Sequence, residues 1–151
     1  GPSASTSPCR PTARSARLDA VIAMGDALPA ADTRLSTTEW NLWLERLPRP
    51  QPAAFCSSLD ERFGFTSTGN MEVKVAWLWL ALASAYDPVL PEVSRVLGAV
   101  GRMKYLVPLY SALLARPETQ GLARETFERN AAGYHPIARA VVRGRIERAS
   151  T

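Results

Sequence analysis

The sequence predicts an all-α protein, an irregular α-α superhelix of about eight helices stacked in the manner of armadillo or HEAT repeats. Apolar residues recur at intervals of three and four along most of the chain, and Pro, Gly or capping residues separate the runs. No segment sustains the two-residue alternation that a half-buried strand requires. Helices of about 10–16 residues joined by short loops pack as antiparallel neighbours, and such pairs in series form a layered stack.

The chain has 151 residues, which is enough for one domain with a sizeable core. We expect the helical domain to cover residues 15–151. Residues 1–14 carry Pro2, Pro8 and Pro11 among Ser, Thr and Arg, a composition typical of a linker. Gly1-Pro2 is also what a protease-cleavage site leaves behind, so the segment is either native linker or such a remnant.

Hydrophobic length and cysteine content both favour a cytoplasmic protein. The longest apolar run, Val75 to Ala83, is shorter than the ~18–20 residues of a membrane span, so no membrane association is expected. The polar N-terminus is unlike a secretory signal. Cys9 and Cys56 are too few for a disulfide framework, and we interpret both as free thiols in a reducing compartment. Cys56 fits a small core residue.

The first two helices are marked by apolar stripes and a capping motif. The first stripe contains Leu18, Val21, Ile22 and Gly25. Residues Ser36 to Glu39 form a capping box, in which the Ser and Glu side chains each accept a hydrogen bond from a free backbone N–H at the helix start. The stripe that follows contains Trp40, Trp43, Leu44 and Leu47, and three prolines after Leu47 end the helix.

Two further helices are predicted before residue 87. The third contains Phe55, Leu59 and Phe63 at intervals of four, and Gly64 ends it. Asn70 is a suitable N-cap for the fourth. That helix is apolar almost all round, with Val73, Val75, Ala76, Trp77, Leu78, Trp79, Leu80 and Leu82. A helix with this composition is central and buried on most sides, and Trp77 is expected in the core.

Four more helices follow the turn at Asp87-Pro88. Their apolar stripes are Leu90, Val93, Val96, Leu97 and Val100; Leu106, Leu109, Tyr110, Leu113 and Leu114; Leu122, Ala123 and Phe127; and Ile137, Val141, Val142 and Ile146. Gly101 fits a C-cap position of the fifth helix. Pro108, Pro117 and Pro136 fit the starts of the sixth, seventh and eighth.

The charge pattern argues against nucleic acid as a partner. The net charge of +4 comes from 18 basic and 14 acidic residues, which are interspersed along the chain. A nucleic-acid binder would show a basic stripe or a recognition motif. The nearest approach is an Arg-rich C-terminal segment, where cations complement the dipole at the end of a helix.

The residue inventory holds neither a metal site nor a catalytic centre. A zinc site needs three or four His, Cys, Asp or Glu ligands at suitable spacing, and the chain contains only one histidine, His135. No H-E-x-x-H motif and no Gly-rich phosphate loop are present. His135 precedes Pro136 at a helix start, so we interpret it as a structural, loop-capping residue.

Arg102 and Lys104 are the candidate binding residues. They lie two positions apart between a helix end and the predicted Pro108 helix start, and Pro108 disfavours helical geometry at Val107. On a helix such a pair would face different directions, whereas at an extended joint both cations can address one anion. On spacing alone, two solvated charges at a turn are the favoured interpretation.

The Gly101–Tyr110 segment resembles the motif near the end of leukotriene A4 hydrolase and its aminopeptidase relatives. The resemblance extends over about residues 15–146, with matching pieces at Arg14–Leu18, Glu39-Trp40 with Leu44, Asn70 to Trp77, and Tyr134–Ala138. It implies a β-rich domain and a thermolysin-like zinc domain preceding this helical one. It also implies that Arg102 and Lys104 bind the free carboxylate of a peptide substrate.

The resemblance therefore predicts the substrate-facing C-terminal domain of a zinc metalloaminopeptidase, which removes N-terminal residues from peptides. Zinc and the catalytic residues would belong to another domain of the same polypeptide, and this chain alone would bind no cofactor. The alternative is a free-standing helical-repeat interaction module without catalysis, because a helical stack can bind peptides without chemistry.

Overall fold

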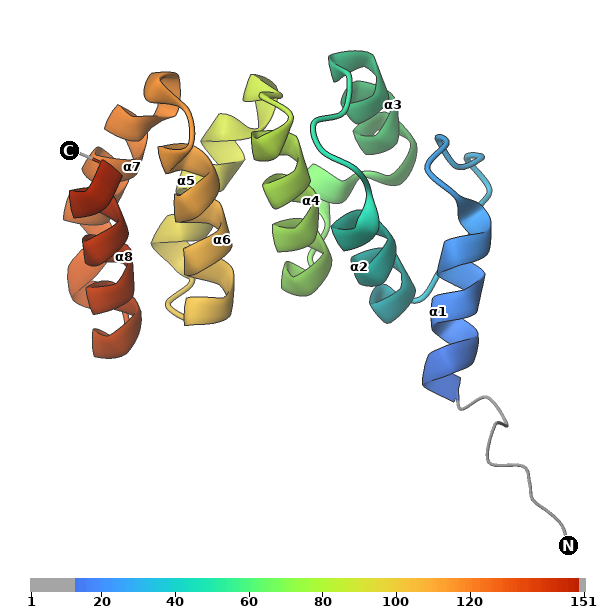
Figure 1. Ribbon diagram of the computed structural model, residues 1–151, viewed down its shortest axis with the longest axis horizontal. Coiled ribbons are helices and arrows are strands. Elements are labelled where there is room, and N and C mark those ends of the chain that lie inside the picture. Colours follow the sequence, from blue (N-terminus) through green and yellow to red (C-terminus); the bar gives the residue numbers. More distant parts are fainter. Residues whose placement is uncertain (1–12, 150–151) are drawn as a thin grey trace, which may run out of the picture.

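The computed structural model describes residues 13–149, and these contain eight α-helices, three short 3-10 turns and no strand (Figure 1). The helices are α1 (Ala13–Met24), α2 (Thr37–Arg46), α3 (Ala53–Phe63), α4 (Met71–Ala83), α5 (Leu90–Ala99), α6 (Met103–Leu114), α7 (Pro117–Asn130) and α8 (Pro136–Ala149). The predicted all-α class with eight helices is confirmed. The first helix begins two residues before the expected domain start at residue 15, and residues 1–12, which include Cys9, lie outside the described part.

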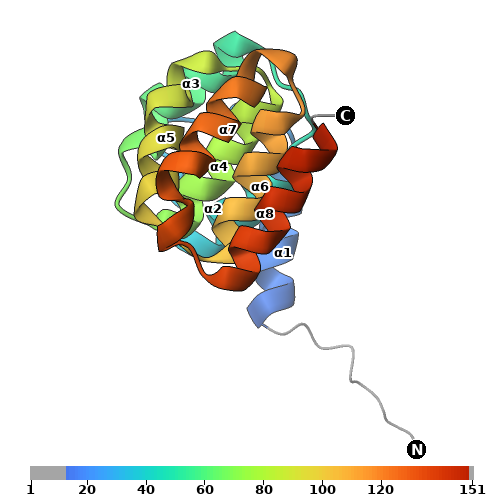
Figure 2. The same ribbon diagram turned by 90° about the vertical axis from the view of Figure 1, so that its left-hand side faces the viewer.

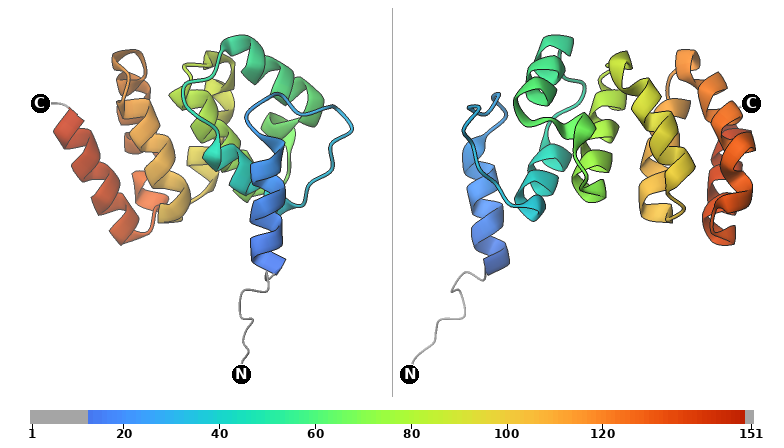
Figure 3. Two further views of the ribbon diagram at one scale, coloured as in Figure 1. Left: turned by 45° about the vertical axis from the view of Figure 1, so that its right-hand side comes forward. Right: turned by 180° about the vertical axis from the view of Figure 1, so that it is seen from behind.

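The helices stack side by side in a layered row. Helices α2, α4, α6 and α8 pack consecutively against one another, and α5 packs on α7 in a second layer (Figure 2). Helix α1 extends the first layer by packing on α2 (Figure 3). Because α7 of the second layer lies between them in the chain, α6 and α8 run in the same direction and begin at the same edge of the row (Figure 1). The closer likeness to armadillo or HEAT repeats stays a prediction.

The predicted caps are present at several helix ends. The Ser36 hydroxyl accepts from the Glu39 N–H at 3.2 Å, and the Glu39 carboxylate accepts from the Ser36 N–H at 2.8 Å. Asn70 caps α4 by accepting from the Val73 N–H at 3.1 Å. Gly64 ends α3 in the left-handed conformation, with φ of 64°, which only glycine adopts without cost. Each of these helix ends is fixed by residues within a few positions in the sequence.

Helix α4 lies at the centre of the core, as its apolar composition predicts. The Trp77 side chain is fully buried, and its indole N–H donates to the Thr66 hydroxyl at 2.9 Å. An aromatic cluster formed by Trp40, Phe63 and Phe65 adjoins it, with Phe65 5.9 Å from the Trp77 ring. Burying large aromatic side chains in contact with one another supplies much of the free energy that holds the stack together.

Two predicted core positions are wrong. Ile22 is 50% exposed and Ile137 is 60% exposed, so each lies on the outer side of its helix. Val21, predicted in the same stripe as Ile22, is buried, and in α8 Ala138 is buried in place of Ile137. The residue spacing allowed either neighbour to face inward, because adjacent residues on a helix are only about 100° apart.

Two helix boundaries also differ from the prediction. Val100, not Gly101, is the C-cap of α5. Pro108 lies inside α6, which begins five residues earlier at Met103. A proline in a helix interior removes one backbone hydrogen bond, and α6 accepts this loss while burying one whole side of its length, including Leu106, Leu109, Tyr110 and Leu113. Tertiary packing therefore overrides the local signal.

Cys56 is fully buried, as expected for a core residue, and burial raises the pKa of its thiol above the ordinary value. Among residues 13–149, no helix has the length and apolar character to cross a membrane.

Candidate substrate-binding surface

The joint between α5 and α6 carries the two predicted cations. Its backbone is extended at Val100, with φ of −111° and ψ of 157°, and again at Arg102, with φ of −82° and ψ of 137°. Arg102 is the N-cap of α6, whereas Lys104 lies within its first turn. The extended joint predicted from the sequence exists, but it ends at Arg102, and only one of the two cations belongs to it.

Lys104 is engaged in an ion pair that sequence reasoning did not predict. Its ammonium group lies 2.5 Å from the Glu72 carboxylate at the start of α4, and the Tyr105 hydroxyl donates to the same oxygen at 2.8 Å. These two hydrogen bonds lower the pKa of Glu72 below its ordinary value, and the bond from Lys104 has the larger effect. Burial, together with the bond to Glu72, raises the pKa of Tyr105. Glu72 therefore largely balances the Lys104 charge.

Arg102 remains the available cation at this joint. Its side chain is exposed and has no ion-pair or hydrogen-bond partner among residues 13–149, and its guanidinium lies 5.9 Å from the Tyr105 ring centre. The Lys104 ammonium lies 5.2 Å from the centre of the same ring. Both cations are thus held around Tyr105, and the cluster of Arg102, Lys104 and Glu72 carries a net charge of about +1 at neutral pH.

The start of α6 adds to this positive potential. Helix N-termini present free N–H groups and a partial positive charge, so acidic residues normally stabilise the first turn. Helices α2, α4, α5 and α7 each place a Glu there, whereas α6, like α1, α3 and α8, has none. The two cations at the start of α6 lie beside the positive end of its dipole, where like charges repel. Binding an anion at this position would therefore be favourable.

A surface hollow of about 440 Å³ adjoins Arg102. It lies between the beginnings of α6 and α8 and is lined by Gly101, Arg102, Met103, His135, Ile137 and Ala138. His135 Nδ1 accepts from the Ile137 N–H at 3.2 Å, so this histidine caps α8 as predicted. Gly101 packs against the backbone at Gly133, since a Cβ atom there would lie 3.5 Å from the Gly133 carbonyl oxygen.

A pair of buried tyrosines links the second half of α6 to the loop before α8 and to the end of α5. The Tyr110 and Tyr134 hydroxyl groups lie 2.8 Å apart, and Tyr134 donates to the Leu97 carbonyl oxygen at 2.7 Å. Burial raises the pKa of both phenols, so they stay protonated. Sequence reasoning assigned Tyr134 no role in the site, because its partners are 24 and 37 positions away.

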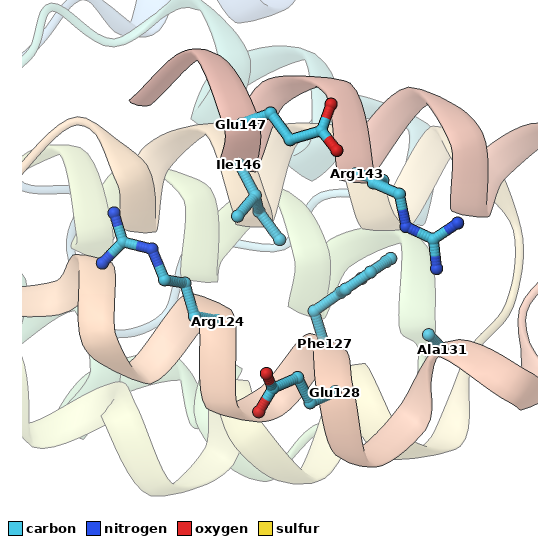
Figure 4. A pocket seen from close by; sticks show the side chains of 7 residues that line it. All are labelled: Arg124, Phe127, Glu128, Ala131, Arg143, Ile146 and Glu147. Atoms are coloured by element: carbon cyan, nitrogen blue, oxygen red, sulfur yellow. The ribbon is translucent and has the colours of Figure 1, made fainter. Parts of the chain in front are cut away.

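A second hollow, of about 480 Å³, lies between α7 and α8 (Figure 4). Phe127 and Ile146 form its apolar floor, and the Arg143 guanidinium lies 5.5 Å from the Phe127 ring centre. Two acids and two bases surround it, namely Arg124, Glu128, Arg143 and Glu147. With no net charge from these four groups, it lacks the preference for an anion that distinguishes the Arg102 hollow.

No group of three or more His, Cys, Asp or Glu side chains within residues 13–149 is arranged to hold a metal ion. The described residues therefore do not fit a zinc site.

The fold defines a helical-stack domain with a cationic joint between α5 and α6. Comparison with known proteins identifies its family. Residues 35–146 match the family described as Leukotriene A4 hydrolase, C-terminal. The chain belongs to this family, and the resemblance seen in the sequence is confirmed. The matched range includes Glu72, Arg102, Lys104 and Tyr134.

The chain is also similar to fungal proteins named leucine aminopeptidase 2. It is 36% identical to the Emericella nidulans protein over 94 residues. This match covers 62% of this chain and 15% of the relative. It is 30% identical over 147 residues to that of Pyricularia oryzae, covering 89% of this chain and 23% of the relative. The chain thus spans less than a quarter of the length of these two relatives.

Proposed function

We propose that this chain is the substrate-facing domain of a zinc metalloaminopeptidase, in which Arg102 binds the free C-terminal carboxylate of a peptide. The observation that carries the proposal is the exposed Arg102 guanidinium at the start of α6, which forms no ion pair among the described residues and whose charge the helix dipole reinforces. Arg102 makes the direct contact, because a guanidinium can pair with both carboxylate oxygens. Lys104, already paired with Glu72, supplies a supporting field.

The proposal assigns the chemistry to another part of the polypeptide. Zinc and the groups that act on the scissile bond would belong to a catalytic domain, and the helical stack would form one wall of the cleft. Binding a carboxylate at a fixed distance from the reacting centre positions the peptide, and such positioning lowers the barrier. The fungal leucine aminopeptidase 2 relatives support peptides as the substrate class.

The test is steady-state kinetics of the complete polypeptide on matched tripeptides that end in a free acid or an amide. A hydrogen bond to a charged group contributes about 1.5–3 kcal/mol. Arg102→Ala should therefore lower kcat/KM on the free acid by roughly ten- to two-hundred-fold. The loss should be small on the amide, which has no carboxylate. Arg102→Lys should restore only part of the activity.

The matched control is Arg46→Ala, an exposed arginine on α2, two helices away along the row. Arg95 is less suitable, because its guanidinium already pairs with Glu92. The control should leave both substrates unaffected. Equal losses on acid and amide in Arg102→Ala would mean that Arg102 shapes the domain and does not bind the carboxylate.

The alternative is a helical-stack interaction module that has lost catalysis. The gene separates the two: an upstream reading frame that encodes an H-E-x-x-H motif favours the peptidase, since two His at this spacing bind zinc from one helix face. An intact upstream frame without that motif favours the module.

A further inference from the structure

We infer that the hollow beside Arg102 binds the apolar side chain of the substrate's C-terminal residue. The inference rests on the proposed carboxylate binding and adds a preference for peptides that end in an uncharged apolar residue such as Leu, Met or Phe. Met103 and Ile137 would contact that side chain.

The first observation is where the exposed apolar side chains lie. In the part of the chain that the structure describes, Ile22, Met103 and Ile137 are the large hydrophobic residues with substantial exposure, at 50%, 42% and 60%. Single exposed apolar residues are common on protein surfaces. Here Met103 and Ile137 line one hollow, and exposed apolar side chains grouped in this way indicate a surface that binds a ligand or a partner.

The second observation is that the Arg102 charge lies beside this apolar surface, which favours a ligand that combines an anion with an apolar group. In a peptide's last residue, the carboxylate and the side chain are attached to the same carbon atom. When Arg102 holds the carboxylate, the side chain of that last peptide residue therefore lies within a few ångströms of the guanidinium. Met103, the residue after Arg102, lines the same hollow. A basic C-terminal side chain would be repelled by Arg102, whereas an apolar one is buried favourably. Met103 suits this role because its flexible thioether adapts to different shapes.

The third observation is that the hollow is already formed. Its two walls are the first residues of α6 and α8, and the Tyr110–Tyr134 pair ties α6 and the loop before α8 to the end of α5. Its volume of about 440 Å³ falls within the range of roughly 300–1,000 Å³ typical of ligand sites. Binding would then require little ordering of the protein, which preserves affinity.

The experiment uses the complete polypeptide and two free-acid tripeptides that differ only in ending with Leu or Ser. The double variant Met103→Ala/Ile137→Ala should reduce the Leu-over-Ser ratio of kcat/KM by about tenfold, on the scale of one partly buried Leu side chain. Each single variant should reduce it by about threefold. Met103→Leu should keep the ratio, and Ile22→Ala, the exposed apolar residue on α1, is the matched control. Circular dichroism and thermal unfolding check that each variant is folded.

The results separate this inference from the proposed function. If Arg102→Ala discriminates acid from amide while the double variant leaves the Leu-over-Ser ratio unchanged, carboxylate binding stands and the apolar subsite is refuted. If the double variant lowers kcat/KM equally on Leu, Ser and amide substrates, the hollow contacts another part of the enzyme, which also overturns the inference. If Arg102→Ala acts equally on acid and amide, the proposed function fails first.

Discussion

The Tyr134 hydroxyl donates a 2.7 Å hydrogen bond to the backbone carbonyl of Leu97, in the last turn of α5. Since the Tyr134 proton is used in this bond, the hydroxyl of Tyr110, 2.8 Å away, donates to Tyr134 in turn. The chain of two bonds links α6, the loop before α8 and the helix that leads into the Arg102 joint. Because Tyr134 is buried, we expect it to position the candidate site without contacting a substrate.

Tyr134→Phe should destabilise the chain by about 1–3 kcal/mol in urea unfolding, because it leaves the Leu97 carbonyl and the Tyr110 hydroxyl buried without partners. Tyr110→Phe removes a single bond and should cost less. In the complete polypeptide, Tyr134→Phe should also weaken the preference for free-acid over amide tripeptides. An unchanged preference in a destabilised variant would limit Tyr134 to a structural role.

Trp77→Ala should cost about 3–5 kcal/mol of unfolding free energy, the range for truncating a large aromatic side chain in a core. The variant also loses the indole bond to Thr66. Trp79→Ala, two positions along the same helix, is the control, because Trp79 is only partly buried and should cost clearly less. A loss below 1 kcal/mol at Trp77 would contradict its central place.

Acid should destabilise the fold through Glu92. Hydrogen bonds from Arg95 and from the buried Lys74 lower the pKa of Glu92 to about 2, compared with an ordinary 4.5. Because the folded-state pKa is the lower one, the stabilisation is complete above about pH 5 and is lost as the pH falls toward 2. Urea unfolding at pH 6 and at pH 3 gives the unfolding free energy at each pH. The loss between the two should be smaller for Glu92→Gln than for the wild type.

The same variant has a second consequence at neutral pH. Glu92→Gln leaves the Lys74 charge buried without its counter-ion and should cost about 3 kcal/mol at pH 7. Lys74→Met/Glu92→Gln should recover most of that loss, because no unpaired buried charge remains. Glu125→Gln is the exposed control and should have little effect at either pH. Equal acid sensitivity in wild type and Glu92→Gln would refute the role of this carboxylate.

The purified chain should contain no stoichiometric zinc and should not cleave aminoacyl reporter substrates. The reason is the ligand inventory: a zinc site needs three or four suitable side chains close together, and the one histidine, His135, is used as a helix cap. Metal analysis and peptidase assays of the purified chain provide the check. One tightly bound zinc ion per chain would contradict the prediction.

Much of the helical framework was predictable from the sequence because its signals are local. The capping box at Ser36, the Asn70 cap and the Gly64 stop each act within a few residues, so the spacing alone identifies them. The burial of Trp77 followed from a helix that is apolar on all sides, a property that any packing arrangement must satisfy.

Part of the candidate site was also predictable. Arg102 and Lys104 stood out as paired cations at a helix boundary, and the resemblance to the Leukotriene A4 hydrolase, C-terminal family gave them an expected role. Their different situations were not predictable, because Glu72 lies 32 positions from Lys104 in the sequence. No local pattern reveals an ion pair between two separate helices.

The sequence by itself thus determined the helix count, the caps at Ser36, Gly64 and Asn70, and the positions of the two cations, since these depend on neighbours within one or two turns. Only the tertiary structure decided that Pro108 lies inside α6 and that Ile137 faces outward. It also decided that Glu72 balances Lys104, leaving Arg102 as the available charge. The physical reason is that burial and ion pairing depend on which helix faces pack together, and that choice is made by the whole core at once.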